Sequence, residues 1–573
     1  MPSPRRDRLR SLPWRRWGRF LGYYAACSLV VAIGAAPVVV ARAIETTRFE
    51  DRLGTLPVEV SLTHNGRSTL DTGIFGKIYW RETGPFGIGA EARVTGPPAA
   101  GGTLASYADS RFIRTNVELI NAPAVVVDAY AAQLASTRRD EIIKGELVAG
   151  LLGGGVLLAI VPWTRLRRSS RAGTLVVVGV LAVAATGLSA GAAVLRFDAW
   201  PGSDPVTGDL RLPGVDQLSF DSPETLEVAR QVQPFIVKNT QRIEQRSAVF
   251  VATAQKTFAG ALEVRGEALR PRGGETLVLA EGDPQGSLVG TRVRAALYAD
   301  LFDFLGPDAL TVRTISGDIT SNGTVAERDF VEGEAQVGGE LPVVAVAGDH
   351  DTETTWQQMG DAGMETPDLD SVEVGELRIA GAHDREHKAL FGALVENPSG
   401  ISEQELGAQL REAVGDDPSV VLLHQPDAAA GFLGFDDLDP VRELPPSLTT
   451  PVDDDIPDQL PGTVSIGHLH DTAGPWVIWN TDGDEITWTV VDQLGTSGGV
   501  ENAPTFNRFS TPVSVPLKPV SVRLQYVDVT SGLQTGYASL TCEVDARCTL
   551  SDRVDVGLPG GQPASAAALT GAP

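Results

Sequence analysis

The sequence predicts an α/β protein whose first 200 residues belong largely to a membrane and whose later part alternates strands with helices. Three observations predict this arrangement. Long uncharged apolar runs occur within the first 200 residues, and each is long enough to cross a bilayer. From residue 274, short Val-rich runs alternate with stretches of helical spacing. After His470 only strand patterns follow, so we expect an α/β unit that ends in strands.

Length, charge and cysteine content limit the possibilities further. A chain of 573 residues is too long for one compact domain, so we expect at least two folded units. The formal net charge of −26 argues against a general basic surface, and no nucleic-acid partner is expected. Cys542 and Cys548 would close a small disulfide loop on the outer side of a membrane. The alternative is two free or buried thiols.

Residues 1–43 are predicted to be a cytoplasmic N-terminus and a first transmembrane helix. Residues 20–41 carry no charge and are long enough to span a bilayer. Seven arginines precede this run, which places its start on the cytoplasmic side: Arg5, Arg6, Arg8, Arg10, Arg15, Arg16 and Arg19. A cleaved signal peptide is the alternative, because Ala41-Arg42-Ala43 loosely resembles a cleavage site. The apolar run is longer than a usual signal core, which favours an anchor.

Residues 144–197 are predicted to hold a second and a third transmembrane helix. The apolar runs cover residues 147–164 and 172–195, and four arginines lie between them. If both arginine clusters face the cytoplasm, residues 44–143 and everything after about residue 197 lie outside. The protein is therefore expected to be a multi-pass protein of the cell membrane with its larger part extracytoplasmic.

The remaining segments are assigned by composition and local pattern. Residues 44–143 mix strand-like stretches with Gly and Pro turns, and their role stays open. Residues 198–273 are expected to form a juxtamembrane linker or stalk that is helical from Ser222 and interrupted at Pro234. Residues 274–556 are expected to fold as one domain with strands at its end. Residues 557–573 are expected to be a disordered tail.

Five strand-like runs of this domain lead into an Asp or a His at the carboxyl end. A sheet holds the backbone at a strand end still while side chains project into a crevice, which suits metal binding or proton transfer. The chain has only seven His, and four of them lie at these ends. The motifs are, in order, Asp283, Gly317-Asp318, Gly348-Asp349-His350-Asp351, His424 and Gly467-His468-Leu469-His470.

In this order the motifs resemble those of the calcineurin-like metallophosphoesterase superfamily, over about residues 275–500. The apolar spans before them and the Gly495–Gly499 stretch after them are similar to a membrane-anchored, actinobacterial-type branch. The resemblance implies a four-layer αββα sandwich that carries two metal ions at its loop rim. Each motif alone would be weak, and only their joint order is specific.

The resemblance also implies a role for each motif residue. Asp318 would bridge the two cations. The other ligands would divide between them: Asp283, Gln285 and His470 for the first cation, and Asp349, His424 and His468 for the second. His350 would protonate the leaving oxygen rather than bind metal, and Asp351 would orient the ring of His350.

Two positions depart from the family pattern. Gln285 stands where the family has a His, and Asp349 stands where it usually has an Asn. An additional oxygen donor and an additional carboxylate favour harder cations, so among Mn²⁺, Mg²⁺, Fe and Zn²⁺ we expect Mn²⁺. Alternatively, the first cation is bound poorly and the chain is a degenerate relative.

The expected function is that of an outward-facing, membrane-anchored phosphoesterase. It would hydrolyse a phosphomonoester or a phosphodiester by metal-activated water, and its partners would be that substrate and the lipid bilayer. The alternative is a non-catalytic binding or scaffold protein of the cell envelope that retains the fold. His383 and His387 lie in a charged stretch and are expected in a solvated loop near the rim.

Overall fold

The computed structural model describes most of the chain as two compact units. It describes residues 14–565 except 54–55, 64–66, 72–76, 81–87, 96–122, 161–185, 188–205, 208–218, 221, 307–308, 322, 389–394, 416–417, 453–454 and 499–518. The first unit comprises Met1–Arg52, Leu56–Pro97 and Tyr130–Gln233. The second comprises Pro234–Pro573 with two short earlier segments, Leu53–Thr55 and Pro98–Ala129.

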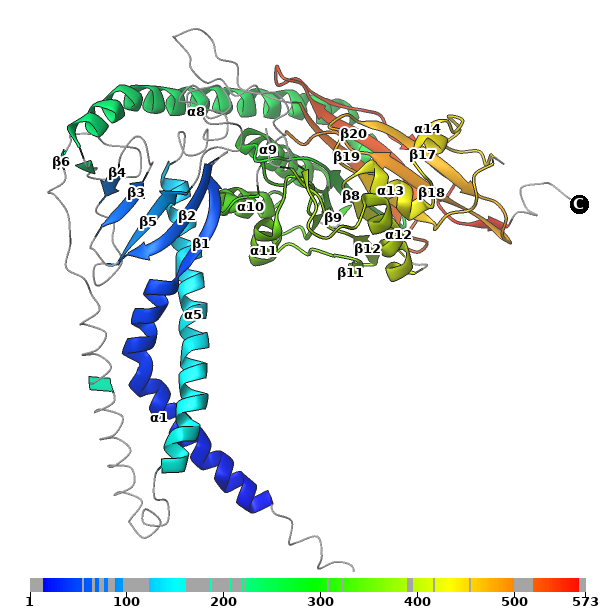
Figure 1. The fold of residues 1–573 in the computed structure, drawn as a ribbon. Coiled ribbons are helices and arrows are strands. Elements are labelled where there is room, and N and C mark those ends of the chain that lie inside the picture. The colour runs from blue at the N-terminus through cyan, green and yellow to red at the C-terminus, as the bar shows by residue number, and fades with distance from the viewer. Residues whose placement is uncertain are drawn as a thin grey trace, which may run out of the picture. The chain divides into compact units, whose positions relative to one another are not determined.

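The first unit combines two long helices with one mixed sheet (Figure 1). The helices are α1 (Trp14–Thr46) and α5 (Pro123–Ile160). The strands are β1 (Arg48–Leu53), β2 (Leu56–Thr63), β3 (Ser68–Asp71), β4 (Lys77–Trp80), β5 (Gly89–Val94), β6 (Val206–Thr207) and β7 (Ser219–Phe220). Their order in the sheet is β1-β2-β5-β3-β4-β7-β6.

Two helices in the described part of the chain are long and apolar enough to cross a membrane. They cover Phe20–Thr46 and Ala129–Ile160 by length and composition, and a signal sequence near the N-terminus would pass the same test. The second expected span, as far as residue 160, forms the end of one continuous helix, α5, which begins at Pro123. The third expected span, 172–195, lies outside the described residues except for 186–187.

Small residues let α1 and α5 approach closely. A Cβ at Gly154 would lie 2.3 Å from Ser28 Oγ, and one at Gly150 would lie 3.1 Å from the Ser28 carbonyl oxygen. The Tyr24 hydroxyl donates to the Leu151 carbonyl at 2.8 Å. Contacts of this kind are typical of helix pairs in lipid, where close backbone packing and interhelical hydrogen bonds hold the helices together.

The second unit begins with the rest of α8 (Pro223–Arg265) and contains two seven-stranded sheets. The first sheet holds β8 (Glu275–Glu281), β9 (Leu310–Ser316), β10 (Val343–Val346), β19 (Val520–Asp528), β20 (Gln534–Cys542), β21 (Cys548–Leu550) and β22 (Val554–Asp555). The second holds β11 (Asp370–Val374), β12 (Leu377–Gly381), β15 (Val420–Leu423), β16 (Gly462–Ile466), β17 (Ala473–Asn480), β18 (Glu485–Gln493) and β23 (Ala564–Ser565). A two-residue pair, β13 (His387–Lys388) and β14 (Val395–Glu396), stands apart.

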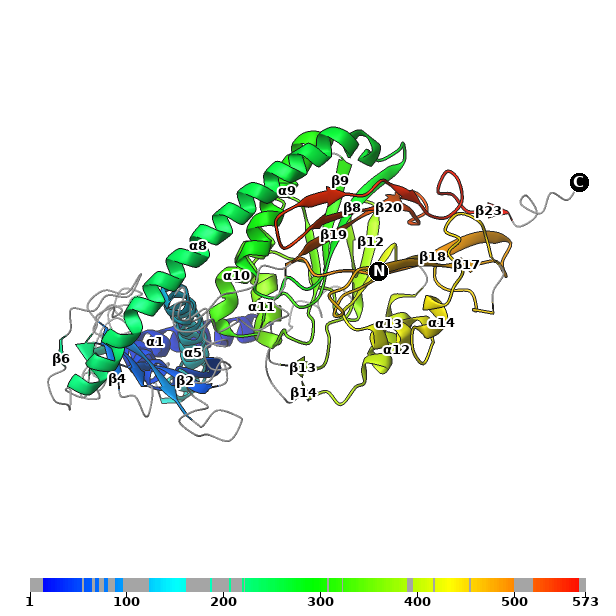
Figure 2. The ribbon, with the colours of Figure 1, turned by 90° about the horizontal axis from the view of Figure 1, so that it is seen from above.

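Helices cover these sheets from different sides. The helices are α9 (Leu288–Leu305), α10 (Arg328–Ala335), α11 (Glu353–Asp361), α12 (Glu403–Val414), α13 (Pro426–Leu433) and α14 (Asp439–Arg442). One apolar core joins α8 and α9 to β8, β19 and β20. Another joins α12, α13 and α14 to the second sheet, where Figure 2 shows these helices together beside β17 and β18. The prediction of a mixed α/β unit is confirmed.

The alternation of side chains along a strand explains why the apolar runs are continuous. In β15, Val420 and Leu422 point into a core shared by strands of both sheets, whereas Val421 and Leu423 point into the core under α12 and α13. Successive side chains of a strand face opposite ways, so a strand covered on both faces must be apolar throughout. Burying each such side chain contributes about 1.5–3 kcal/mol.

A buried ionic cluster joins α9 and α10 to the first sheet. Arg294 and Arg313 each contact the carboxylates of both Glu281 and Glu334, and all four side chains are fully buried. Arg294 also donates through Nε to the Ser497 carbonyl at 3.0 Å. The pairing is tolerable because every charge has an opposite partner, whereas removal of one member from such a cluster typically costs about 3–5 kcal/mol.

Two boundaries differ from the sequence-based expectation. Helix α8 continues through Pro234 instead of being interrupted there. The tail expected to be disordered from residue 557 is ordered as far as residue 565. Leu558 is buried in an apolar cluster with Trp488, and β23 pairs with β18. The last eight residues lie outside the described part.

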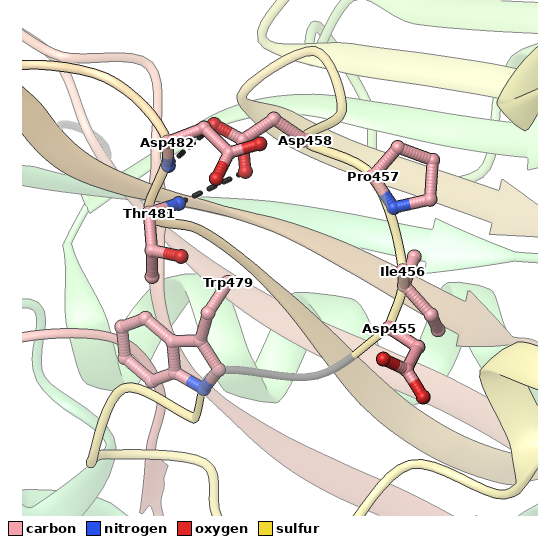
Figure 3. Close-up of a pocket in the computed structure, with 7 residues that line it drawn as sticks. All are labelled: Asp455, Ile456, Pro457, Asp458, Trp479, Thr481 and Asp482. Atoms are coloured by element: carbon pink, nitrogen blue, oxygen red, sulfur yellow. Dashed lines mark hydrogen bonds between the residues drawn. The ribbon is translucent and has the colours of Figure 1, made fainter.

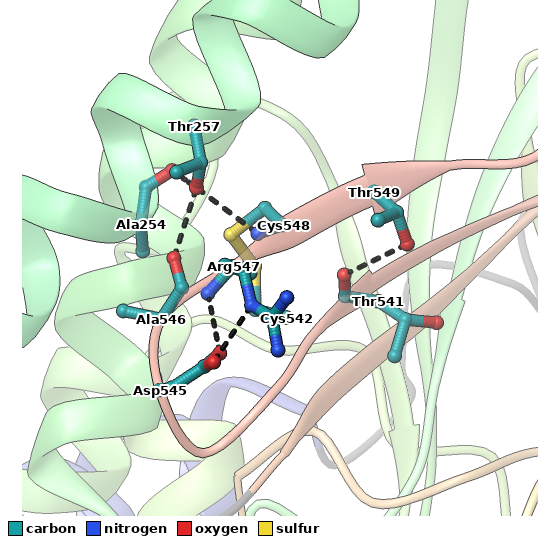
Figure 4. Close-up of a disulfide and its surroundings, with 9 residues drawn as sticks. All are labelled: Ala254, Thr257, Thr541, Cys542, Asp545, Ala546, Arg547, Cys548 and Thr549. Carbon is teal, nitrogen blue, oxygen red and sulfur yellow. Dashed lines mark hydrogen bonds and ion pairs between the residues drawn. A yellow bond between two sulfur atoms is a disulfide. The ribbon is translucent and has the colours of Figure 1, made fainter.

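The disulfide between Cys542 and Cys548 is present and closes the β20–β21 turn (Figure 4). Thr257 of α8 ties this turn to the helix, since its hydroxyl donates to the Ala546 carbonyl at 2.9 Å and accepts from the Cys548 amide at 3.0 Å. Cys27 is a free, buried cysteine in α1. The expected pairing of the two late cysteines is therefore confirmed.

Candidate metal centre

The strand register brings the five motifs to one edge of the second unit. Strands β8, β9 and β10 run parallel in the first sheet, and β15 and β16 run parallel in the second. The predicted ligands follow the carboxyl ends of these strands, and neighbouring parallel strands have their carboxyl ends at the same edge of the sheet. Hydrogen bonds cross between the sheets there: the Ser316 hydroxyl donates to the Ser465 carbonyl at 3.3 Å, and the His468 amide donates to both carboxylate oxygens of Asp283 at 3.1 Å.

The backbone is strained at most of the predicted ligands. In the described part of the chain, seven residues other than glycine have a positive φ. Five of them are predicted metal ligands: Asp283, Gln285, Asp318, His468 and His470, with φ between 40° and 70°. Such conformations cost about 1–3 kcal/mol each and cluster at functional sites. Residues with strained φ angles are thus concentrated in the loops that orient the predicted metal ligands.

Three glycines that precede ligands leave room for the imidazole of His424 and the carboxylate of Asp318. A Cβ at Gly317 would lie 2.4 Å from His424 Nδ1, and one at Gly348 would lie 2.3 Å from Asp318 Oδ1. A Cβ at Gly467 would lie 2.3 Å from the Ser316 carbonyl oxygen. Any larger residue at these positions would clash with His424, Asp318 or the Ser316 carbonyl. The glycines of the Gly-Asp and Gly-His pairs are therefore needed for steric reasons.

His424 is held with Nε2 facing the acidic cluster. Its Nδ1 lies 2.9 Å from the Ser316 carbonyl, to which it donates, so in the neutral form, the form that binds a cation, the lone pair lies on Nε2. Nε2 lies 3.3 Å from Asp318 Oδ1 and 3.4 Å from Asp349 Oδ1. His468 Nδ1 lies 3.2 Å from the same Nε2. An imidazole oriented in this way is typical of a metal ligand.

The carboxylates of the cluster are buried and are paired only with histidines. Asp283, Asp318 and Asp349 are each at most 3% exposed, and no Lys or Arg of the described residues forms an ion pair with them. Burial raises the pKa of Asp283 well above its ordinary value, although the charge of His424 opposes this. Burial lowers the pKa of His424, but Asp318, Asp349 and Asp283 together outweigh it and leave the pKa well above 6.5. A bound cation would supply the missing positive charge.

Three overlapping groups have ligand atoms within 4.8 Å of one another. They are Asp349, His424 and His468; Asp283, Asp318 and His424; and Asp318, Asp349 and His350. Asp318, Asp349 and His424 each belong to two of these groups, and the carboxylates of Asp318 and Asp349 could each contact two cations. His470 lies beside the second group, with Nε2 3.8 Å from Asp283 Oδ1. These residues fit a centre that holds divalent cations.

Gln285 lies in the cluster, but its amide nitrogen rather than its oxygen faces the Asp318 carboxylate. Its Nε2 donates to Asp318 Oδ2 at 2.7 Å, and its buried Oε1 has no hydrogen-bond partner among the described residues. The amide therefore neutralises part of the Asp318 charge and leaves one oxygen for a cation. An orphaned buried oxygen of this kind has a physical explanation if a cation binds there.

The structure corrects the role expected for Asp351. Its carboxylate accepts from the amides of Ile319, Thr320 and Gly348 at 2.8–3.0 Å and from the Thr320 hydroxyl at 2.7 Å. It therefore joins the loops after β9 and β10 instead of orienting the ring of His350. That ring has its Nε2 3.9 Å from Asp318 Oδ2, and its Nδ1 makes no hydrogen bond to the part of the chain that the structure describes.

The charged stretch after β12 is also not the solvated loop expected from the sequence. His383 is 4% exposed, stacks on Trp356 with ring centroids 4.7 Å apart, and accepts the Ala347 amide on Nδ1 at 2.9 Å. Burial lowers the pKa of His383 to about 4. Arg385 pairs with Asp368 at 2.8 Å. His383 thus supports the end of β10, and the charged residues that follow it in the sequence concealed this.

One turn near the cluster makes contacts that the sequence did not predict. The turn at residues 495–498 contacts the backbone of Gly282, Asp283 and His470 through Thr496 and Ser497. The Gly-rich composition of the turn was visible in the sequence, but its partners lie far away along the chain.

A second acidic group lines a cavity of about 210 Å³ at the opposite end of β17 from His470 (Figure 3). Asp458 there accepts the amides of Thr481 and Asp482 at 2.9 and 3.0 Å. Its carboxylate is therefore occupied in holding the turn after β17. The cavity contains none of the predicted ligands.

Comparisons with known proteins do not assign a function to this chain, so the functional assignment rests on the geometry of the site. No family model matches the chain, and no curated protein matches it. Among solved structures, the chain is similar to TT1561 of Thermus thermophilus at 14% identity and a TM-score of 0.25. The similarity covers 47% of this chain and 99% of that one. A likeness at this level carries no argument about function.

Proposed function

We propose that this protein is a membrane-anchored phosphoesterase that uses two divalent cations to hydrolyse a phosphomonoester or a phosphodiester. The observation that carries the proposal is the convergence of Asp283, Asp318, Asp349, His424, His468 and His470 at one strand-end edge. They come from five strands and carry most of the strained φ angles in the described chain. The layering of helices and sheets in the second unit supports the calcineurin-like αββα arrangement.

The surroundings of Asp318, His424 and His350 indicate which part of the reaction each side chain would serve. When bound, two divalent cations would supply the positive charge that stabilises an in-line displacement at phosphorus. Asp318 lies in two ligand groups and would hold both cations, while the fixed Nε2 of His424 keeps a lone pair directed inward. His350 is held through its amide, which donates to Asp318 Oδ1 at 2.9 Å, and its ring would deliver a proton to the leaving oxygen.

The placement outside the cell is part of the same proposal. The two apolar helices and the arginines before the first of them support an anchor with a cytoplasmic N-terminus. The disulfide between Cys542 and Cys548 supports an oxidising compartment for the second unit, since cytosolic thiols are kept reduced.

The test is a screen of the full chain in detergent with added Mn²⁺ against aryl phosphate monoesters and diesters. We expect hydrolysis of at least one ester that depends on added cation and is abolished by a chelator. The Asp318→Asn variant, measured beside it, should have no cation-dependent activity. Binding of cation without turnover of any ester would favour the alternative of a non-catalytic envelope protein.

A further inference from the structure

One residue contacts the backbone of two strained ligands at once. The Thr496 hydroxyl donates to the Asp283 carbonyl at 3.0 Å, and the Thr496 amide donates to the His470 carbonyl at 3.1 Å. Asp283 has φ 55° and His470 has φ 60°. A strained conformation persists only where surrounding contacts hold it, so these two hydrogen bonds stabilise the geometry that directs both side chains.

The next residue reinforces this hold. The amide and the hydroxyl of Ser497 both donate to the Gly282 carbonyl at 2.8 Å, directly before Asp283. Thr496 and Ser497 are buried, with exposed fractions of 5% and 0%. This short turn therefore donates three hydrogen bonds to the Gly282 and Asp283 carbonyls, at the start of the Asp283 loop.

The turn itself is anchored in the interior. Arg294, a member of the buried ionic cluster, donates to the Ser497 carbonyl at 3.0 Å. Helix α9 approaches the turn so closely that a Cβ at Gly290 would lie 2.8 Å from the Ser497 carbonyl oxygen and 3.0 Å from Gly498 Cα. The Gly-rich turn is thus a rigid support whose position is set by α9 and its ionic cluster.

We infer that Thr496 is a positioning residue for one half of the metal centre, the half formed by Asp283 and His470. The inference rests on the proposed metal site. Its hydroxyl and amide hold the two ligands that face each other across 3.8 Å, whereas the ring of His424 is held by the Ser316 carbonyl. His468 is linked to the first half through its amide, which donates to the Asp283 carboxylate. Loss of the Thr496 hydroxyl should therefore weaken the site of Asp283 and His470 more than the other.

The experiment is a Mn²⁺ titration of the metal-stripped full chain by calorimetry. Thr496→Val removes the hydroxyl and keeps the amide and the shape, and Thr496→Ser keeps the hydroxyl. We expect Thr496→Val to weaken one of two sites by about 10- to 100-fold, as is typical when a group supporting a ligand is lost. Thr496→Ser should restore the wild-type affinity.

Thr463→Val is the matched control, because Thr463 is also buried and its hydroxyl donates at 2.9 Å to Gln534 of β20 rather than to a ligand loop. It should leave both affinities unchanged. If Thr496→Val does not fold, Ser497→Ala tests the same turn, with the same selective weakening expected. Equal weakening of both sites, unchanged affinities or failure of Thr496→Ser to rescue would overturn the inference. A wild-type chain that binds no Mn²⁺ would overturn the proposed function instead.

Discussion

Gln285 Nε2 donates a hydrogen bond of 2.7 Å to Asp318 Oδ2, so one of the two residues that depart from the expected motif pattern is bonded to the expected bridging carboxylate. This contact gives Gln285 two functions that a His would not combine. The amide nitrogen stabilises the charge of Asp318, and the amide oxygen remains for a cation. Because an amide oxygen is a harder and weaker donor than an imidazole nitrogen, this arrangement favours Mn²⁺ or Mg²⁺ over Zn²⁺.

The first prediction concerns Gln285→His. It replaces the oxygen donor with a nitrogen donor, so we expect higher cation affinity at one site and a shift of preference towards Zn²⁺. Competition titrations with Mn²⁺ and Zn²⁺ measure this. Gln358→His is the matched control, since Gln358 is also buried but its amide reaches only the Thr324 and Val325 carbonyls. An unchanged metal preference in Gln285→His would mean that Gln285 is not a ligand.

The second prediction concerns Asp318→Asn. The change keeps the shape but removes the negative charge that two cations would share, so bound metal and hydrolysis should be lost together. Elemental analysis beside rate measurements checks both. Asp492→Asn is the control, because Asp492 is fully buried and pairs with Arg523 at 3.0 Å. Retention of two cations by Asp318→Asn would remove Asp318 from the bridging position.

The third prediction separates proton transfer from metal binding. His350→Asn should retain the cations and lose roughly 10²–10⁴-fold in rate on an ester with a poor leaving group. The loss should be much smaller on an activated aryl ester, whose leaving group needs little protonation. Equal losses on the two esters, or loss of metal, would contradict the role of His350 as the acid.

The fourth prediction concerns acid stability and the pair of Glu275 with Arg553, which lie 2.7 Å apart. Burial raises the pKa of Glu275, but hydrogen bonds from Arg553, the Arg272 amide and Thr535, together with the charge of Arg553, outweigh this and lower the pKa from 4.5 to about 2. The contribution of the pair to stability is thus present above pH 4.5 and lost as the pH falls towards about 2. Wild type should lose more denaturant resistance over this range than Glu275→Gln. Glu267→Gln, at a side chain that is 79% exposed, should behave like the wild type.

The fifth prediction tests the orientation in the membrane. If the expected span over residues 172–195 is added to the two apolar helices, the number of spans is odd, and a cytoplasmic N-terminus would place the second unit outside. A reporter that is active only in the cytoplasm, fused after Pro573, should remain silent. A matched fusion of the same reporter before Met1 should be active. An active C-terminal fusion would overturn the outward-facing reading.

The sequence by itself located the strand ends that bring Asp and His side chains together, and it favoured a disulfide between Cys542 and Cys548. Both are local patterns: an apolar run that ends in Gly-Asp or Gly-His places a side chain at a sheet edge, and a short spacing allows a hairpin disulfide. The apolar runs likewise located α1 and the end of α5. Such features follow from neighbours in the chain, so no long-range contact is needed to predict them.

Only the tertiary structure decided the partners of the polar groups. Thr496 reaches Asp283 across 213 positions of sequence, and Asp351 turns to Thr320 instead of His350. His383 is buried against Trp356 although the residues that follow it in the sequence are charged. The physical reason is that a buried donor or acceptor must be satisfied by whatever group the packing brings near it, and that group is set by sheet register rather than by sequence neighbourhood.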